Sequence, residues 1–281
     1  MDVSPLRVAV VGHVEWVRFA RVAHVPRAGE IMHAEDVFEE PAGGGAVAAV
    51  QLARLAGRAT LVTAFGDDEL AARSVERLGE LGVDVWAATR DCPTRTAVSL
   101  VDDSRERTIT TFGTRLHACA EDVQIDWSAL SEMDAIYFTA GDLGALQAAR
   151  RARVLVATPR TSDALGHGVA LDALVFSGDD SLERRAAEEA RAEAALMVRT
   201  AGADGGSYTT RSGASGSWAS TPPPGDPVDS YGCGDSFAAG LTYGLGARLA
   251  IGEALTLAAR CGAVCLTGSG PYTHQLTAAE L

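Results

Sequence analysis

Short apolar runs alternate with helix-like runs through the middle of this chain, and this alternation constrains the fold more than any other feature. The runs expected to form strands are Ala135–Phe138, Arg153–Ala157, Ala173–Phe176 and Leu196–Thr200. Helix-like runs at roughly Leu143–Arg151 and Leu182–Ala195 lie between them. Strands that alternate with helices usually pair in parallel within one sheet. The sequence therefore predicts a single α/β domain over residues 1–281, with a doubly wound, mostly parallel sheet flanked by helices.

The composition of the chain limits the kinds of partner that it is expected to bind. The chain has 281 residues, 47% of them apolar, and a formal net charge of −13. An acidic chain is a poor partner for nucleic acid or an anionic membrane. No apolar run has the length and purity of a membrane span, and the N-terminus lacks the layout of a signal peptide. Five cysteines without a Cys-x-x-Cys pair fit a reducing compartment and no zinc site. A cytoplasmic protein is expected.

All 24 basic residues are arginine, because the chain contains no lysine. A phosphate-binding loop that depends on lysine is therefore impossible. Any phosphate clamp in this chain must use arginine, backbone N–H groups or a metal ion.

The stretch Asp229–Asp235 has the character of an anion site. Gly232 and Gly234 permit unusual backbone conformations and close approach of a ligand, and a helix-like run follows at Phe237–Leu245. The start of a helix presents unpaired N–H groups to an anion. Asp235 falls at the N-cap or in the first turn, where its carboxylate could deprotonate a hydroxyl beside that anion. The alternative is an ordinary Asp-capped helix after a glycine turn.

Two segments of the N-terminal half also suggest a site. The apolar run Leu6–Gly12 is expected to form the first strand, and alternation places His13, Glu15 and Val17 on one side just beyond its carboxyl end. Open α/β sheets bind ligands at such ends. Gly43, Gly44 and Gly45 precede a second helical run, Val47–Leu55.

The stretch 229–235 resembles the Asp-Thr-x-Gly-Ala-Gly-Asp signature of the ribokinase-like (phosphofructokinase B) family of carbohydrate kinases, with Ser230 for Thr and Cys233 for Ala. The resemblance covers nearly the whole chain. It implies an ATP-dependent kinase that uses Mg²⁺, in which Asp235 takes the proton from the attacking hydroxyl. The backbone N–H groups of Gly232, Cys233 and Gly234 would stabilise the transferring phosphoryl group. A helix N-terminus lowers a thiol pKa, so a reactive Cys233 is expected.

The resemblance also assigns the acceptor side. In the family pattern Gly-x-x-Asn-x-Asp, Glu15 stands at the position of the Asn and Val17 at the position of the Asp. Because Val17 is apolar, Glu15 is the residue of this pair that could still bind a substrate hydroxyl. The pattern Gly-Gly-x-x-x-Asn places Ala48 at the Asn. The backbone of Gly43, Gly44 and Gly45 would meet the substrate. Segments at about 15–41 and 95–113 resemble the strands of the family's small β lid, and their edges could pair in a homodimer.

The nucleotide side is assigned in the same way. The family's Asn-x-x-Glu, which organises magnesium and its waters, corresponds to Ser177 and Asp180. Asp180 is therefore a candidate to hold the metal through water, with the N-cap of the following helix as the alternative. Gly202 and Gly205 resemble a turn near the nucleotide phosphates, and Asp229 would lie close to them.

The sequence thus predicts a kinase that phosphorylates a hydroxyl of a small molecule, with a sugar or sugar derivative as the expected acceptor. A nucleoside kinase shares the Asp235 arrangement and stays open. So does a non-catalytic binding protein of the same fold, although such a protein would not need a base beside an anion site.

Overall fold

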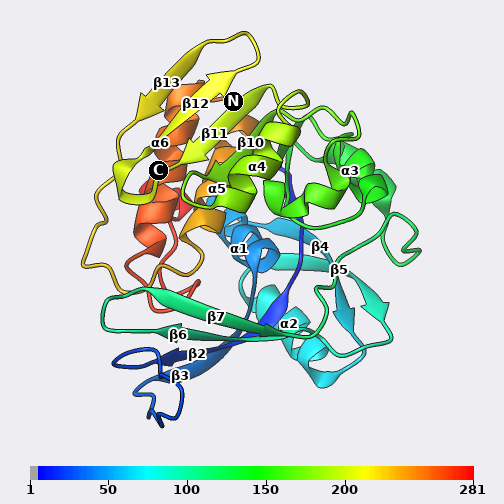
Figure 1. Cartoon of the computed structure of the whole chain (residues 1–281). Helices are drawn as coiled ribbons and strands as arrows, with labels where there is room; N and C mark the ends of the chain where they lie inside the picture. Colours follow the sequence, from blue (N-terminus) through cyan, green and yellow to red (C-terminus); the bar gives the residue numbers. More distant parts are fainter. Residues whose placement is uncertain (1–5) are drawn as a thin grey trace.

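The computed structural model describes residues 6–281, which form two β-sheets (Figure 1). The larger sheet has nine strands in the order β13-β12-β11-β10-β9-β8-β1-β4-β5. These are β1 (Val8–Val11), β4 (Ala59–Gly66), β5 (Val83–Arg90), β8 (Ala135–Phe138), β9 (Val154–Ala157), β10 (Ala173–Ser177), β11 (Leu196–Thr200), β12 (Gly206–Thr210) and β13 (Ser215–Trp218). Residues 1–5 of the predicted domain lie outside the described part.

Pairing is parallel from β5 to β11, and only β12 and β13, at one end of this sheet, pair in antiparallel fashion. The predicted mostly parallel sheet is therefore confirmed. Strand β1 lies between β4 and β8, so the chain first builds the sheet to one side of β1 and later to the other. Ligands bind beyond the carboxyl ends of the strands at such a reversal.

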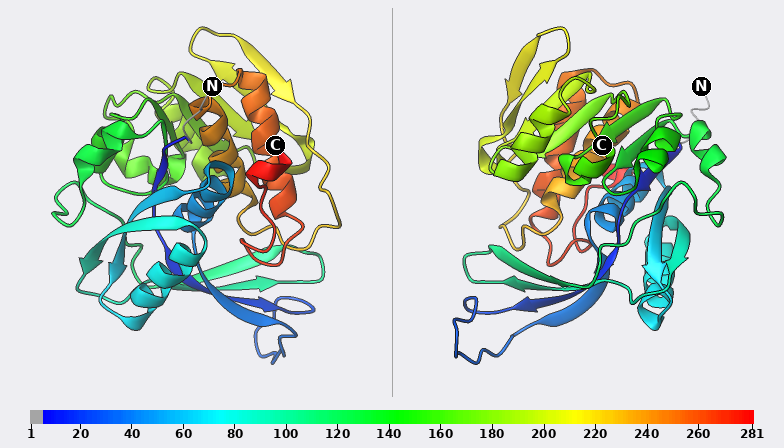
Figure 2. Two further views of the ribbon diagram at one scale, coloured as in Figure 1. Left: turned by 180° about the vertical axis from the view of Figure 1, so that it is seen from behind. Right: turned by 45° about the vertical axis from the view of Figure 1, so that its right-hand side comes forward.

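Helices cover both faces of the large sheet. They are α1 (Gly44–Ala56), α2 (Glu69–Glu80), α3 (Leu143–Ala149), α4 (Ser181–Glu189), α5 (Cys233–Gly246) and α6 (Ile251–Cys265). Alternation along β1 sends Val8 and Val10 into a core with α1, α5 and α6, and Ala9 and Val11 into a core with α3 and α4. Figure 2 shows α1, α5 and α6 together on one side of the sheet.

The smaller sheet has the strand order β3-β2-β6-β7. Its strands are β2 (Glu15–Arg21), β3 (Val37–Ala42), β6 (Thr96–Val101) and β7 (Arg107–Phe112). They fall within the two segments that the sequence assigns to a lid. Strand β2 follows β1 after only three residues, so the chain passes directly from the large sheet into the small one, which lies across the lower part of Figure 1.

Some elements differ from the sequence expectation. Strand β5 and the β12–β13 hairpin were not predicted. Strand β5 is a half-buried edge strand whose apolar residues are split by Asp84, and the strands of the hairpin are rich in Ser, Thr and Gly and lack an apolar run. Helix α4 ends at Glu189 rather than near Ala195. Within residues 6–281, no helix combines the length and the apolar character needed to cross a membrane.

Helices α5 and α6 pack closely because small residues line their contact. A Cβ atom built on Gly240 would lie 2.7 Å from Cys261 Sγ and 2.9 Å from the Cα of Ala258. Such distances leave no room for a methyl group unless the two helices separate.

Gly240→Ala should therefore destabilise the protein by about 1–3 kcal/mol, the usual cost of overpacking a core. Gly79→Ala in α2 is the control, because nothing lies within 4 Å of a Cβ built there. That change should leave stability unaltered or raise it by about 0.5–1 kcal/mol, since alanine favours helices. Urea unfolding measures both variants. Equal effects of the two substitutions would contradict the close α5–α6 contact.

Candidate functional site

A cavity of about 300 Å³ opens beyond the carboxyl end of β1. Its lining comes from the β1–β2 junction, the start of α1, the small sheet, the segment after β9 and the start of α5. Five residues predicted from the sequence line it: Glu15, Gly43, Gly44, Gly232 and Asp235. The structure thus brings together residues more than 200 positions apart in the chain.

Helix α5 begins at Cys233, directly after Gly232, which adopts a left-handed conformation with φ 81°. Asp235 lies in the first turn of the helix, as predicted. The N–H groups of this turn have no partner within the helix, as at any helix start. Nothing lies within 4 Å of a Cβ built on Gly234, so open space adjoins the exposed N-terminus of α5.

Helix α1 begins beside α5. A Cβ built on Gly44 would lie 2.9 Å from Asp235 Oδ1, so the Asp235 carboxylate lies against the first turn of α1. The Gly43 N–H donates to Tyr231 Oη at 3.1 Å, which fixes this start to the loop before α5. The Gly45 N–H donates to the His13 carbonyl at 3.2 Å, so this amide already has an acceptor.

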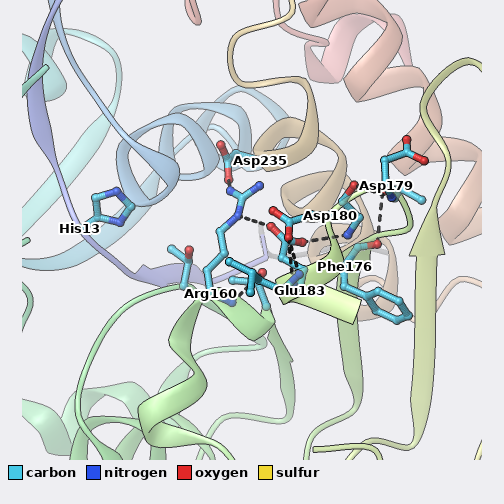
Figure 3. Close-up of polar contacts among 12 residues, drawn as sticks. His13, Arg160, Phe176, Asp179, Asp180, Glu183 and Asp235 are labelled. Atoms are coloured by element: carbon cyan, nitrogen blue, oxygen red, sulfur yellow. Dashed lines mark hydrogen bonds and ion pairs between the residues drawn. The ribbon is translucent and has the colours of Figure 1, made fainter. Parts of the chain in front are cut away.

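Arg160 lies three residues beyond the end of β9. It bridges two carboxylates (Figure 3). Its Nη1 donates to Asp235 Oδ1 at 3.1 Å and its Nε donates to Glu183 Oε1 at 2.7 Å. Glu183 is buried, and its other oxygen accepts the Ser177 N–H at 2.8 Å. Asp235 and Glu183 raise the pKa of Arg160 above its ordinary value, so the guanidinium stays charged. This contact holds the Asp235 carboxylate in a fixed orientation.

Glu15 is the second carboxylate of the cavity. It is 5% exposed, and its Oε2 lies 3.1 Å from Arg95 Nε. Burial raises the pKa of Glu15, while Arg95 and Arg115 oppose that rise. Val17 and Ala48, which the sequence resemblance aligns with two polar positions, are fully buried in the core. Glu15 is therefore the residue of this group that reaches the cavity.

His13 and Arg115 form a pair on the same side as Glu15. Arg115 Nη2 donates to His13 Nδ1 at 3.1 Å and to the Thr139 carbonyl at 2.8 Å. Arg115 Nη1 donates to the Arg160 carbonyl at 3.1 Å. Burial and the charge of Arg115 hold the pKa of His13 well below its ordinary value. His13 is accordingly neutral, with Nδ1 as an acceptor.

The residues predicted for the nucleotide side lie outside this cavity. Asp180 is the N-cap of α4, and its Oδ1 accepts the N–H groups of Leu182 and Glu183. Asp229 is 3% exposed, and its oxygens accept the N–H groups of Tyr231 and Gly270. It orders the loop before α5.

Gly202 and Gly205 flank a short 3₁₀ turn after β11, both with positive φ. Their contact with a nucleotide stays a prediction, as do those of Asp229 and Asp180.

The reactive thiol expected at Cys233 stays a prediction, and its surroundings act against it. A hydrogen bond with Cys265 and burial raise the pKa of Cys233, which opposes the reactivity expected from the helix N-terminus. Cys265 belongs to α6, so its proximity to Cys233 depends on helix packing that the motif does not encode.

Seven further residues of the lining were not assigned a role from the sequence: His13, Arg95, Arg107, Ile109, Arg115, Arg160 and Tyr231. One signal was available for Arg160. It follows the predicted strand Arg153–Ala157, and the carboxyl ends of parallel strands meet at the ligand-binding edge of the sheet. No comparable signal marks Arg115, which lies in an irregular segment.

Comparison with known proteins decides the family. The sequence pattern of the pfkB family carbohydrate kinases matches residues 6–175 and 172–278. This chain belongs to the pfkB family. Mouse ribokinase is 29% identical over 155 residues, which are 52% of this chain and 48% of the mouse protein. The match therefore spans about half the length of that relative.

Solved structures of the family share the fold. Ribokinase from Thermotoga maritima gives a TM-score of 0.78 at 20% identity, over 98% of this chain and 97% of that one. Arabidopsis thaliana ribokinase, complexed with ribose and ATP, gives 0.77 at 17% identity over 99% and 97%. Adenosine kinase from Sinorhizobium meliloti gives 0.75 at 17% identity over 98% of each chain. The ribokinase-like fold predicted from the sequence is confirmed.

The depressed pKa of His13 predicts a pH-dependent stability. Below its ordinary pKa of about 6.5, a histidine binds a proton in the unfolded chain, whereas the folded protein keeps His13 neutral. Its contribution is therefore present above that pH and is lost as the pH falls. Relative to His13→Gln, the wild-type protein should lose about 1.4 kcal/mol between about pH 7.5 and pH 5.5. Urea unfolding at both pH values measures the difference, and parallel changes in the two proteins would contradict a neutral His13.

Proposed function

We propose that this protein is an ATP-dependent kinase that phosphorylates a hydroxyl group of a small molecule, a sugar or sugar derivative. The observation that carries the proposal is the place of Asp235. Its carboxylate lies in the first turn of α5, against the start of α1, and it lines a cavity beside an open helix N-terminus. A base next to an anion-binding helix start has the geometry needed for phosphoryl transfer to a hydroxyl.

Each group has a defined part in this reaction. Asp235 accepts the proton of the attacking hydroxyl. Arg160, already 3.1 Å from Asp235 Oδ1, keeps the carboxylate aligned and adds positive charge beside the group in transfer. The backbone N–H groups of Gly232, Cys233 and Gly234 stabilise the negative charge of the phosphoryl oxygens. Most of the rate enhancement then comes from positioning and electrostatics.

The residues present fit a magnesium nucleotide. Mg²⁺ is usually held by one or two carboxylates together with phosphate oxygens and waters. Asp180 is exposed, and capping of α4 uses its Oδ1, so Oδ2 remains for a metal-bound water. Bound Mg²⁺ would neutralise charge on the phosphates. Residues 6–281 contain no cluster of three potential metal ligands.

The acceptor would occupy the side of the cavity near Glu15. This buried carboxylate can accept hydrogen bonds from substrate hydroxyls. Arg107 and Ile109 of β7 also line the cavity, so the small sheet forms one wall. Movement of this sheet would exclude water and protect ATP from hydrolysis.

A nucleoside acceptor is the second candidate. The adenosine kinase of Sinorhizobium meliloti and the nucleoside kinase of Methanocaldococcus jannaschii have the same fold, with a TM-score of 0.75 in each case. ADP formation measured with a panel of sugars, sugar derivatives and nucleosides discriminates between the two acceptor classes. A protein that binds ATP but forms no ADP with any acceptor would instead be a binding member of the family.

Asp235→Asn keeps the size of the side chain but removes the base. Its kcat should fall by about a hundred- to ten-thousandfold, the usual contribution of general base catalysis, while the Kd for ATP changes little. Asp142→Asn is the control, because Asp142 caps α3 and lies outside the cavity lining. Undiminished turnover in Asp235→Asn would refute the proposed mechanism.

A further inference from the structure

The cavity is rich in positive charge although the whole chain is acidic. The formal net charge is −13, yet Arg95, Arg107, Arg115 and Arg160 all line the cavity. Only two carboxylates, Glu15 and Asp235, appear in the same lining. A cleft lined by one sign of charge concentrates ligands of the opposite sign. The four arginines therefore indicate an anionic occupant.

The four arginines differ in how their charge is balanced. Arg160 pairs with Asp235 and Glu183, and Arg95 lies 3.1 Å from Glu15. Within residues 6–281, neither Arg107 nor Arg115 forms an ion pair with a carboxylate. The charges of Arg107 and Arg115 are therefore not balanced by an ion pair within residues 6–281.

Arg107 and Arg115 reach different sides of the cavity. Arg107 Nη1 donates to the carbonyl and the hydroxyl of Ser230, next to the start of α5 where the phosphoryl group would be transferred. Arg115 contacts His13 at the β1–β2 junction, on the side of Glu15. Arg107 therefore suits a phosphate of the nucleotide, whereas Arg115 faces the acceptor.

Arg115 has an environment that a bound anion would complete. Its three hydrogen-bond partners are two carbonyls and the neutral His13 ring, and its Nε has no partner in the described protein. Burial lowers the pKa of Arg115 from its ordinary value, and Arg95 and Arg160 lower it further, while Glu15 offsets only part of this effect. A buried charge without a counter-ion is destabilising, and an acceptor anion would remove that cost.

We propose that the natural acceptor carries an anionic group, a carboxylate or a phosphate, and that Arg115 binds this group while the acceptor hydroxyl faces Asp235. The proposal rests on the kinase function proposed above. The guanidinium of arginine matches the planar, two-oxygen geometry of both anions. The substrate class is then a sugar acid or a sugar phosphate. A neutral sugar or nucleoside would leave Arg115 uncompensated.

Calorimetry without ATP tests this assignment at fixed ionic strength. D-gluconate and D-glucose 6-phosphate are the anionic probes, and D-glucose is the neutral probe. Wild-type protein should bind at least one anionic probe about tenfold or more tightly than glucose, since charge-assisted hydrogen bonds are about twice as strong as neutral ones. Which anion binds better separates a carboxylate acceptor from a phosphate acceptor.

Arg115→Gln should abolish the preference for the anionic probe. Arg54→Gln should keep it, because Arg54 also donates to backbone carbonyls and is partly buried, but it lies outside the cavity lining. If Arg115→Gln does not fold, Arg115→Lys provides the second variant. Lysine keeps the charge but loses the two-point geometry of the guanidinium. Arg115→Lys should therefore weaken binding of the anionic probe more than binding of glucose.

Equal affinity of wild-type protein for anionic and neutral probes would overturn the inference, as would an unchanged preference in Arg115→Gln. These binding results are separate from turnover. ADP formation with neutral sugars and without an anion preference would leave the kinase function intact and refute the role of Arg115. Anion binding that depends on Arg115, in a protein that forms no ADP with any acceptor, would instead refute the kinase function.

Discussion

The site depends on a close backbone contact between the end of β1 and the start of α1. A Cβ built on Gly45 would lie 2.6 Å from the His13 carbonyl oxygen, and one on Gly12 would lie 2.6 Å from the Gly45 Cα. Only glycine permits this approach without displacement of the backbone. The contact brings the start of α1 beside the start of α5, and the Asp235 carboxylate lies between them. Two helix N-termini thus act on one small volume.

Charge is arranged in the cavity so that each carboxylate has a cationic partner. Arg160 holds Asp235 and Glu183, and Arg95 lies beside Glu15. Removing one member of a buried pair is costly, because the other charge then loses its compensation. The chain contains no lysine, so arginine supplies all of this compensation and the remaining charge that we assign to ligands. The proposed base and the proposed acceptor preference therefore depend on the same group of charged side chains.

The fold and the glycine-rich backbone segments of the site could be predicted from the sequence, but the arginines that line the cavity could not. Buried strands such as Ala135–Phe138 were predictable because their apolar runs are continuous, and the motif at 229–235 located Asp235. The edge hairpin lacked such a run, and its strands form through pairing with β11. Arg115 reaches the cavity from an irregular segment, and Cys265 reaches Cys233 from another helix. Tertiary packing, rather than local pattern, determines both placements.

A substitution at Gly234 tests whether phosphoryl transfer takes place at the start of α5. Gly234 and Gly252 each occupy the second position of a helix, with open space where a Cβ would be. The measurement is acceptor-dependent ADP formation by Gly234→Ala and Gly252→Ala, with unfolding free energies as the check on folding. We expect both variants to fold and only Gly234→Ala to lose turnover, by about a hundredfold or more, because its methyl group would displace the transferring phosphoryl group. Equal, near-wild-type turnover in both variants would contradict phosphoryl transfer at the start of α5.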